Sequence, residues 1–134
     1  MRFEGHSEAK TGWDGVGTGT VMVAEPIVGV LTFEESGMWH PRAADTSPVE
    51  FKNVFRWSDI NGVLRLEHLR FGVDHPVVLF DMVPDEYGVW RAQSPHQCGE
   101  DCYSASLMRG DENIVMAWSI MGPRKQEAIR YRYW

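Results

Sequence analysis

The feature that most constrains the fold is the repetition of short runs in which apolar and other residues alternate. Alternation with a period of two is typical of half-buried strands, whereas helices repeat apolar residues every three or four positions. About ten such runs follow one another along the 134 residues, separated mostly by glycine, proline, asparagine or aspartate. The expected strands are Phe3–Ala9, Thr18–Ala24, Val28–Met38, Phe51–Trp57, Val63–Phe71, Val77–Val83, Gly88–Gln93, Cys102–Arg109, Ile114–Met121 and Ala128–Tyr133.

Turn-forming residues stand where these runs end. Ile60-Asn61-Gly62 lies between two runs rich in aromatic and β-branched residues, and Asn-Gly is the strongest short signal for a hairpin. Gly110–Asn113 and Gly122-Pro123 separate later runs, and Glu25-Pro26 is expected to break the second run from the third. Ser47–Glu50 has the layout of a capping box, so at most one helical turn is expected before the next strand.

The number of strands predicts a closed sheet. Ten successive antiparallel strands expose two edges unless the sheet closes into a barrel, and closure removes both edges. A sandwich of two sheets is the alternative, but short connections of uniform length favour an up-and-down meander. We therefore expect an all-β fold in which residues 1–134 form a single antiparallel up-and-down barrel of about ten strands. A barrel of this size is either filled by side chains or holds one small ligand.

Composition and charge exclude several classes of protein. With 43% hydrophobic and 24% charged residues, the chain is not disordered. The net charge of −6 argues against binding to nucleic acid, which requires a surplus of basic residues. The longest uncharged stretch, Asn113–Pro123, has about half the length of a membrane-spanning helix. The N-terminus does not resemble a secretory signal, so a cytoplasmic protein without a membrane partner is expected.

The negative charge is unevenly distributed. Arg124–Trp134 contain four basic residues and one acidic residue, a net charge of +3, so the rest of the chain carries −9. Arg124 and Lys125 stand on the turn before the last strand, at one mouth of the expected barrel. Two cations there would attract an anionic group, Arg124 by a bidentate contact and Lys125 as a point charge. The alternative is that they are solvated or pair with acidic neighbours.

Aromatic side chains share strand faces and indicate a pocket. Phe55 and Trp57 are two residues apart and therefore share one face of their strand. Trp118 lies on an apolar face of a later strand. With one of the two tyrosines of the last strand, these rings would enclose an apolar cavity that also carries a few polar groups. Such a mixture is typical of small-ligand sites. The alternative is a core that side chains fill completely.

A cluster of chemically active residues precedes the eighth expected strand. His96, Cys98 and Cys102 are residue types that bind zinc, and Asp101 or His75 would have to complete such a site. The alternative is a turn that enters the strand. Cys98 would be a nucleophile only if its pKa were lowered. We expect no metal and no other cofactor.

Two neighbouring carboxylates give a further expectation. Glu34 and Glu35 are adjacent on an expected strand and therefore point to opposite faces, so they cannot act together as an acid/base pair. One of them is expected inside the barrel. A buried carboxylate needs a partner, and Arg56 or Arg65 from nearby strands is expected to supply an ion pair.

Several motifs carry a family likeness. The segment His96–Tyr103 has the pattern His-x-Cys-Gly-x-Asp-x-Tyr, and Trp118–Lys125 ends in Gly-Pro-Arg-Lys. The same pattern includes Arg70–Gly72, Pro76–Asp81 and Arg130-Tyr131. Together these motifs resemble an uncharacterised family of small bacterial proteins, catalogued as a domain of unknown function. The likeness runs from about Val28 to the end of the chain, implies a lipocalin-like barrel, and supplies no activity.

A second resemblance is to the calycin barrels, which include lipocalins, fatty-acid-binding proteins and nitrobindins. Trp13–Gly17 is similar to the Trp-x-Gly-x-Gly part of the nitrobindin signature, although Thr11 replaces the first glycine. Nitrobindins bind haem through a histidine near the C-terminus, whereas the last histidine here is His96, so haem is not expected. Fatty-acid-binding proteins hold a carboxylate with Arg-x-Tyr, but Arg130–Tyr133 place two arginines on one face and two tyrosines on the other.

Together these observations predict a calycin-like barrel that binds a small, partly apolar and anionic molecule. An enzyme of the isomerase or cyclase type is the first alternative, with His96, Cys98, Asp101 and Tyr103 as acid and base groups. A homodimer that covers an apolar outer face is the second. The residues expected to bind the ligand are Phe55, Trp57, His68, His96, Cys98, Asp101, Tyr103, Trp118, Arg124, Lys125 and Tyr131.

Overall fold

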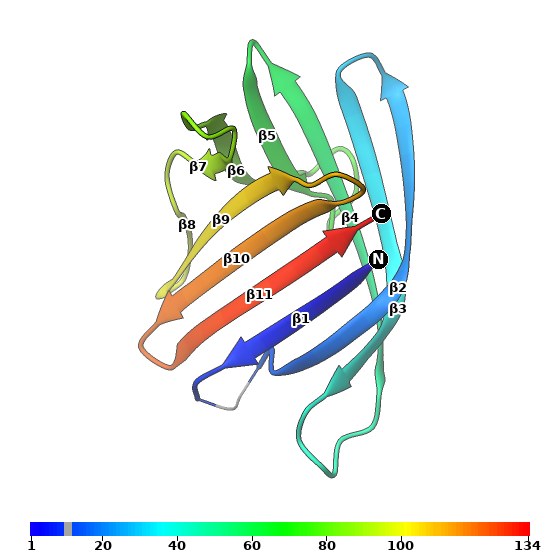
Figure 1. The fold of residues 1–134 in the computed structure, drawn as a ribbon, viewed down its shortest axis with the longest axis vertical. Helices are drawn as coiled ribbons and strands as arrows, with labels where there is room; N and C mark the ends of the chain where they lie inside the picture. The colour runs from blue at the N-terminus through cyan, green and yellow to red at the C-terminus, as the bar shows by residue number, and fades with distance from the viewer. Residues whose placement is uncertain (10–11) are drawn as a thin grey trace.

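The protein is built from strands alone in the residues that the computed structural model describes, which are 1–9 and 12–134. Thr11, which replaces a glycine of the nitrobindin signature, lies outside them. No helix in the described part has the length and apolarity needed to cross a membrane. Figure 1 shows the eleven strands, which are β1 (Arg2–Ser7), β2 (Gly15–Ile27), β3 (Val30–Pro41), β4 (Val49–Ile60), β5 (Val63–His68), β6 (Val77–Pro84), β7 (Trp90–Ala92), β8 (His96–Cys98), β9 (Asp101–Arg109), β10 (Ile114–Gly122) and β11 (Lys125–Tyr133).

The sheet closes into an up-and-down barrel. All strand pairs are antiparallel, and each strand of the ring pairs with the next one in the chain, apart from the step from β7 to β9. The ring closes because β11 pairs with β1 as well as with β10. Ten strands form the ring, since β8 pairs only with β9. The predicted all-β barrel is thus confirmed, and the sandwich alternative is wrong.

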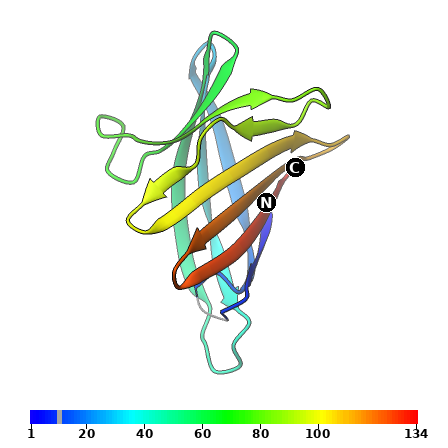
Figure 2. The same ribbon diagram turned by 90° about the vertical axis from the view of Figure 1, so that its left-hand side faces the viewer.

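The ring has a seam beside β8. β7 and β8 follow one another along the same edge of β9, β7 at Ser106 and Leu107 and β8 at Asp101–Tyr103 (Figure 2). β6 pairs with β7 only through Met82–Pro84. The first half of β6 therefore has β5 as its only hydrogen-bonded neighbour among the described strands. A cleft of about 250 Å³ lies along this seam.

Several local expectations need correction. The strand expected over Val63–Phe71 ends at His68, where a loop begins. Pro26 does not end the second strand, because β2 continues to Ile27 through a bulge, one of the few places where a sheet tolerates proline. No helical turn forms before β4, which starts at Val49. The three-residue strand β8 was not expected at all.

The Asn61-Gly62 turn forms as predicted. Asn61 has φ of 54° and Gly62 has φ of 84°, the left-handed pair that a type I′ hairpin requires. The Asp59 carboxylate accepts a hydrogen bond from the Gly62 amide at 2.9 Å, which fixes the turn further. This turn joins β4 to β5 and sets the register that carries Phe55 and His68 to opposite positions.

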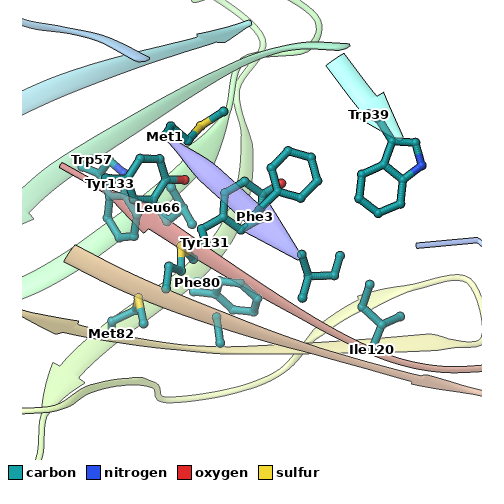
Figure 3. Close-up of a cluster of buried hydrophobic side chains, with 13 residues drawn as sticks. Met1, Phe3, Trp39, Trp57, Leu66, Phe80, Met82, Ile120, Tyr131 and Tyr133 are labelled. Carbon is teal, nitrogen blue, oxygen red and sulfur yellow. The ribbon is translucent and has the colours of Figure 1, made fainter. Parts of the chain in front are cut away.

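The middle of the barrel is filled by a stack of aromatic rings (Figure 3). Ring centroids lie 5.3 Å apart between Trp39 and Phe3, 4.6 Å between Phe3 and Tyr131, and 5.8 Å between Tyr131 and Tyr133. Gly17 makes room for the stack, since a Cβ atom there would collide with the Phe3 ring. Each stacked pair adds about 0.5–1.5 kcal/mol beyond the burial of its area.

Candidate functional site

Two chambers lie on either side of this aromatic core. Along β11, Ile129 and Tyr131 line one of them and Tyr133 lines the other. The first, which we call the His68 chamber, has a volume of about 340 Å³ and is lined by Trp13, Asn53, Phe55, His68, Arg70, Phe71, Val77, Leu79, His96, Cys98, Tyr103, Trp118, Ile120, Ile129 and Tyr131. The second, the Tyr133 chamber, has a volume of about 630 Å³ and is lined by Val21, Val23, Phe33, Gly88, Trp90, Leu107, Arg109–Ile114, Tyr133 and Trp134.

Aromatic rings form much of the wall of the His68 chamber. The imidazole of His68 stacks on Phe55, with ring centroids 4.8 Å apart and planes 24° from parallel. The Trp118 ring, on β10, is also close to Phe55, with ring centroids 6.4 Å apart. The alternation of β4, β5 and β10 brings these three side chains to the inside of the barrel, because every second residue of a strand faces the same way.

The His68 chamber contains basic groups and no acidic ones. Arg70, His68 and His96 line it, and none of its described lining residues is an aspartate or a glutamate. The guanidinium of Arg70 lies 4.8 Å from the centre of the Phe71 ring, a cation–π contact at the start of the loop that follows β5. Burial, together with the charge of Arg70, lowers the pKa of His68, so the imidazole is neutral at neutral pH.

β8 supplies two of the chemically active side chains. His96 and Cys98 are two residues apart and therefore face the same way, into the chamber. His96 pairs in register with Tyr103, and their ring centroids are 6.2 Å apart in an edge-to-face arrangement. Burial raises the pKa of the Tyr103 hydroxyl, so it is protonated at neutral pH. An imidazole, a thiol and a phenol thus line the same wall.

Glu35 is a buried carboxylate whose hydrogen-bond partners line the two chambers. Its side chain is fully buried, with 0% exposure. The Tyr133 hydroxyl donates a hydrogen bond to Oε1 at 2.6 Å, and Asn53 Nδ2 donates one to Oε2 at 3.2 Å. The expectation that Glu34 or Glu35 lies inside the barrel is correct, but the arginine partner is wrong. Arg56 pairs with Glu67 at 2.6 Å and Arg65 pairs with Asp81 at 2.8 Å.

Comparison with known families supplies an identity but no activity. Residues 3–134 match the family of unknown function DUF6314. The chain belongs to this family. No curated protein and no solved structure matches the chain significantly. The resemblance to a family of unknown function is therefore confirmed, while its bacterial origin and the likeness to calycin barrels stay predictions.

Most of the expected ligand-binding residues come together in the His68 chamber. As members of a binding site they stay predictions. The expected residues that line the chamber are Phe55, His68, His96, Cys98, Tyr103, Trp118 and Tyr131. Trp57 lies elsewhere, packed in the core against Phe33 with ring centroids 6.5 Å apart. Its strand face was interpreted correctly, but the barrel is filled at that level.

The expected anion site on the Gly122–Lys125 turn does not reach the chamber. Lys125 forms an ion pair with Asp101 at 3.2 Å, so two of the expected ligand-binding residues neutralise each other. This hydrogen bond raises the pKa of Lys125. Arg124 is exposed on the turn. The alternative interpretation, pairing with an acidic neighbour in the same fold, is the correct one for Lys125.

Sequence patterns missed two polar residues of the chamber. The sequence indicates Arg70 only as part of a family motif, since the expected strand Val63–Phe71 includes it, whereas the structure places it in the loop after β5. Asn53 was placed on the same face as Phe55, but nothing in the pattern indicated its contact with Glu35. Among the described residues no group of three or more His, Cys, Asp or Glu side chains is arranged to hold a metal ion. Cys102 pairs in register with Gln97, away from the chamber that Cys98 lines.

Proposed function

We propose that this protein binds a small, partly apolar anion in the His68 chamber. The observation that carries the proposal is the combination of an aromatic wall with three basic groups and no carboxylate among the described lining residues. A volume of about 340 Å³ lies near the lower end of the range for small-ligand pockets, so the ligand is small.

The arrangement of the chamber suggests how such a ligand is oriented. Phe55, His68 and Trp118 offer flat surfaces for an apolar or aromatic body. Arg70 stands where the chamber meets solvent and presents a guanidinium suited to a carboxylate, sulfonate or phosphate oxygen pair. The apolar end of the ligand therefore lies among the rings, and its charged end lies toward Arg70.

The seam beside β8 supports access to the chamber. Leu79 and His96 line both the chamber and the cleft of about 250 Å³ along the seam, so the two hollows adjoin. Because the first half of β6 lacks a hydrogen-bonded neighbour on this side, the wall opens here without loss of sheet hydrogen bonds. A ligand reaches the rings by this route.

The test is a fluorescence titration with anilinonaphthalene sulfonate, an aromatic anion that emits strongly only in apolar surroundings. We expect saturable binding to the folded protein. Arg70→Met should weaken it by about tenfold to a hundredfold, because a charge-assisted hydrogen bond contributes about 1.5–3 kcal/mol. Arg109→Met is the matched control, since Arg109 lines the Tyr133 chamber instead. Equal effects of the two variants, or no binding by the wild type, would refute the proposal.

A second candidate function is acid–base catalysis in the same chamber. The observation that favours it is the convergence of His96, Cys98 and Tyr103 on one wall, where an isomerase or cyclase would need its proton donors and acceptors. Asp101 drops out of this group because it pairs with Lys125. The probe is phenylpyruvate, an aromatic anion with an exchangeable C–H proton, followed by proton NMR in deuterium oxide. Exchange faster than in buffer, and lost in His96→Gln, supports catalysis, whereas the buffer rate excludes it for this substrate class.

The homodimer stays a prediction. Scattered apolar side chains are exposed on the outer wall, among them Met22, Val78 and Met121. Sedimentation equilibrium of the purified protein decides between a monomer and a dimer.

A further inference from the structure

Glu35 joins the two chambers through its hydrogen bonds. Tyr133, which donates to Oε1, lines the Tyr133 chamber, and Asn53, which donates to Oε2, lines the His68 chamber. Glu35 itself is fully buried and lines neither. No arginine, lysine or histidine in the described part of the chain lies within ion-pair distance of its carboxylate.

A carboxylate in this position gains a proton easily. Moving an ionised carboxylate out of water without a cationic partner is costly, and the group avoids the cost by taking up a proton. Burial raises the pKa of Glu35, and the hydrogen bonds from Tyr133 and Asn53 offset part of that rise because they favour the ionised form. The second carboxylate of the pair on β3, Glu34, faces solvent and has no such constraint.

The protonation state of Glu35 determines what Asn53 offers to the chamber. An ionised carboxylate only accepts hydrogen bonds, so it holds the NH₂ end of the Asn53 amide and leaves the amide oxygen for the chamber. A protonated Glu35 can donate instead, and an amide turned by half a rotation then accepts that proton on its oxygen. In the turned amide the NH₂ group faces the chamber. Asn53 thus changes from an acceptor to a donor.

We propose that Glu35 is a positioning residue that couples anion binding in the His68 chamber to the uptake of a proton. The inference rests on the proposed function, because an anionic ligand selects the arrangement in which Asn53 donates. In that arrangement Glu35 is protonated and Asn53 turns its NH₂ group toward the ligand. A neutral ligand with a hydrogen-bond donor selects the opposite arrangement. Glu35 therefore determines which charge the chamber accepts, without touching the ligand.

The other titratable groups near Glu35 do not replace it. From β11, Tyr131 and Tyr133 face it, and burial raises the pKa of both hydroxyls, so they stay protonated at neutral pH. From the residue before β1, the amino group of Met1 acts on it as a positive charge and donates to the Gly19 carbonyl at 3.0 Å. Two imidazoles, His68 and His96, also line the chamber, so the experiment must separate any contribution that they make to proton uptake.

The experiment is calorimetric titration of anilinonaphthalene sulfonate into the full chain at neutral pH, in two buffers with different ionisation enthalpies. The difference between the buffers gives the number of protons taken up for each probe bound. We expect proton uptake by the wild type and by His68→Asn, which removes one of the two imidazoles. In Glu35→Gln the uptake should fall to the contribution of the imidazoles, and binding at pH 8 should be at least as strong as in the wild type.

A second variant keeps the test valid if Glu35→Gln does not fold. Tyr133→Phe keeps the carboxyl group but removes a donor to its ionised form, so the pH range of proton uptake should move upward. A Glu35→Gln protein that takes up as many protons as the wild type would overturn the inference and leave the proposed function intact, and so would an unmoved pH range in Tyr133→Phe. A folded wild type that does not bind the probe would overturn both.

Discussion

The two chambers share one barrel but differ in charge. β9, β10 and β11 contribute to the walls of both, and both are lined mainly by apolar and aromatic side chains. The His68 chamber has basic groups only, whereas the Tyr133 chamber places Arg109 beside Asp111 and Glu112. The second chamber offers two carboxylates for one guanidinium, so under the proposed function we expect an anion to bind in the first chamber and not in the second.

The difference lies in the connections more than in the strands. Arg70 comes from the loop after β5, and His96 from the short strand β8 that interrupts the step from β7 to β9. Asp111 and Glu112 come from the turn between β9 and β10. The barrel wall thus provides two similar apolar chambers. The loops and turns between the strands, together with the short strand β8, give each chamber its own charged groups. This is the usual division between a rigid scaffold and the loops that carry its chemistry.

The largest effect is expected from filling the chambers. Leu79→Trp adds a bulky ring to the His68 chamber and should weaken binding of anilinonaphthalene sulfonate by at least about tenfold, because excluding the probe removes most of its apolar contact. Val23→Trp does the same to the Tyr133 chamber and should leave binding within about twofold. Fluorescence titration of both variants, with thermal melts as the folding control, decides this. If Val23→Trp weakened binding more than Leu79→Trp, the anion site would lie in the Tyr133 chamber and the proposal would be wrong.

Binding of a neutral probe should not depend on Arg70. N-phenyl-naphthylamine has no negative charge, so Arg70→Met should leave its binding unchanged although it weakens binding of the sulfonate. Competition between the two probes shows whether they share a chamber. If the neutral probe loses as much affinity as the anion in Arg70→Met, then Arg70 acts through the shape of the chamber and the contrast in charge has no role.

The pH dependence of stability tests whether the pKa of Glu35 is raised in the folded protein. Its pKa is raised in the folded protein, so the native state binds more protons than the unfolded chain above the normal pKa of a glutamate. Stability from this group is complete at low pH and is lost as the pH rises through the folded-state pKa. Glu35→Gln should therefore gain in melting temperature relative to the wild type as the pH rises above the normal pKa of a glutamate. A constant difference would mean that Glu35 keeps a normal pKa.

The smallest effect is expected at the Gly122–Lys125 turn. Arg124→Gln removes an exposed charge outside both chambers and should change binding of the anionic probe by less than about twofold. Raising the salt concentration should weaken that binding to a similar extent in both proteins, because the contact with the exposed Arg70 is screened in both and Arg124 does not contribute to it. A clear loss in Arg124→Gln would restore the turn as the anion site.

Alternation in the sequence was sufficient to predict the fold, and it predicted which residues face inward on β4 and β10. It was not sufficient for β8, because three residues between turns are too few to show a period. It also could not predict the partner of Glu35, since Tyr133 is 98 residues away and meets it only after the barrel closes. Arg70 was missed for a third reason: the expected strand Val63–Phe71 is too long, because the strand ends at His68 and Arg70 lies in the loop that follows.

The seam beside β8 has a consequence for rates. Amides along the first half of β6 that lack a partner across the seam are not protected by sheet hydrogen bonds on that side, so this part of the wall should exchange its hydrogens earlier than the rest of the barrel. If molecules pass through it, the frequency with which it opens limits both association and release. A disulfide or bulky residue placed across the seam would then prolong the residence of a bound molecule while changing its equilibrium affinity little.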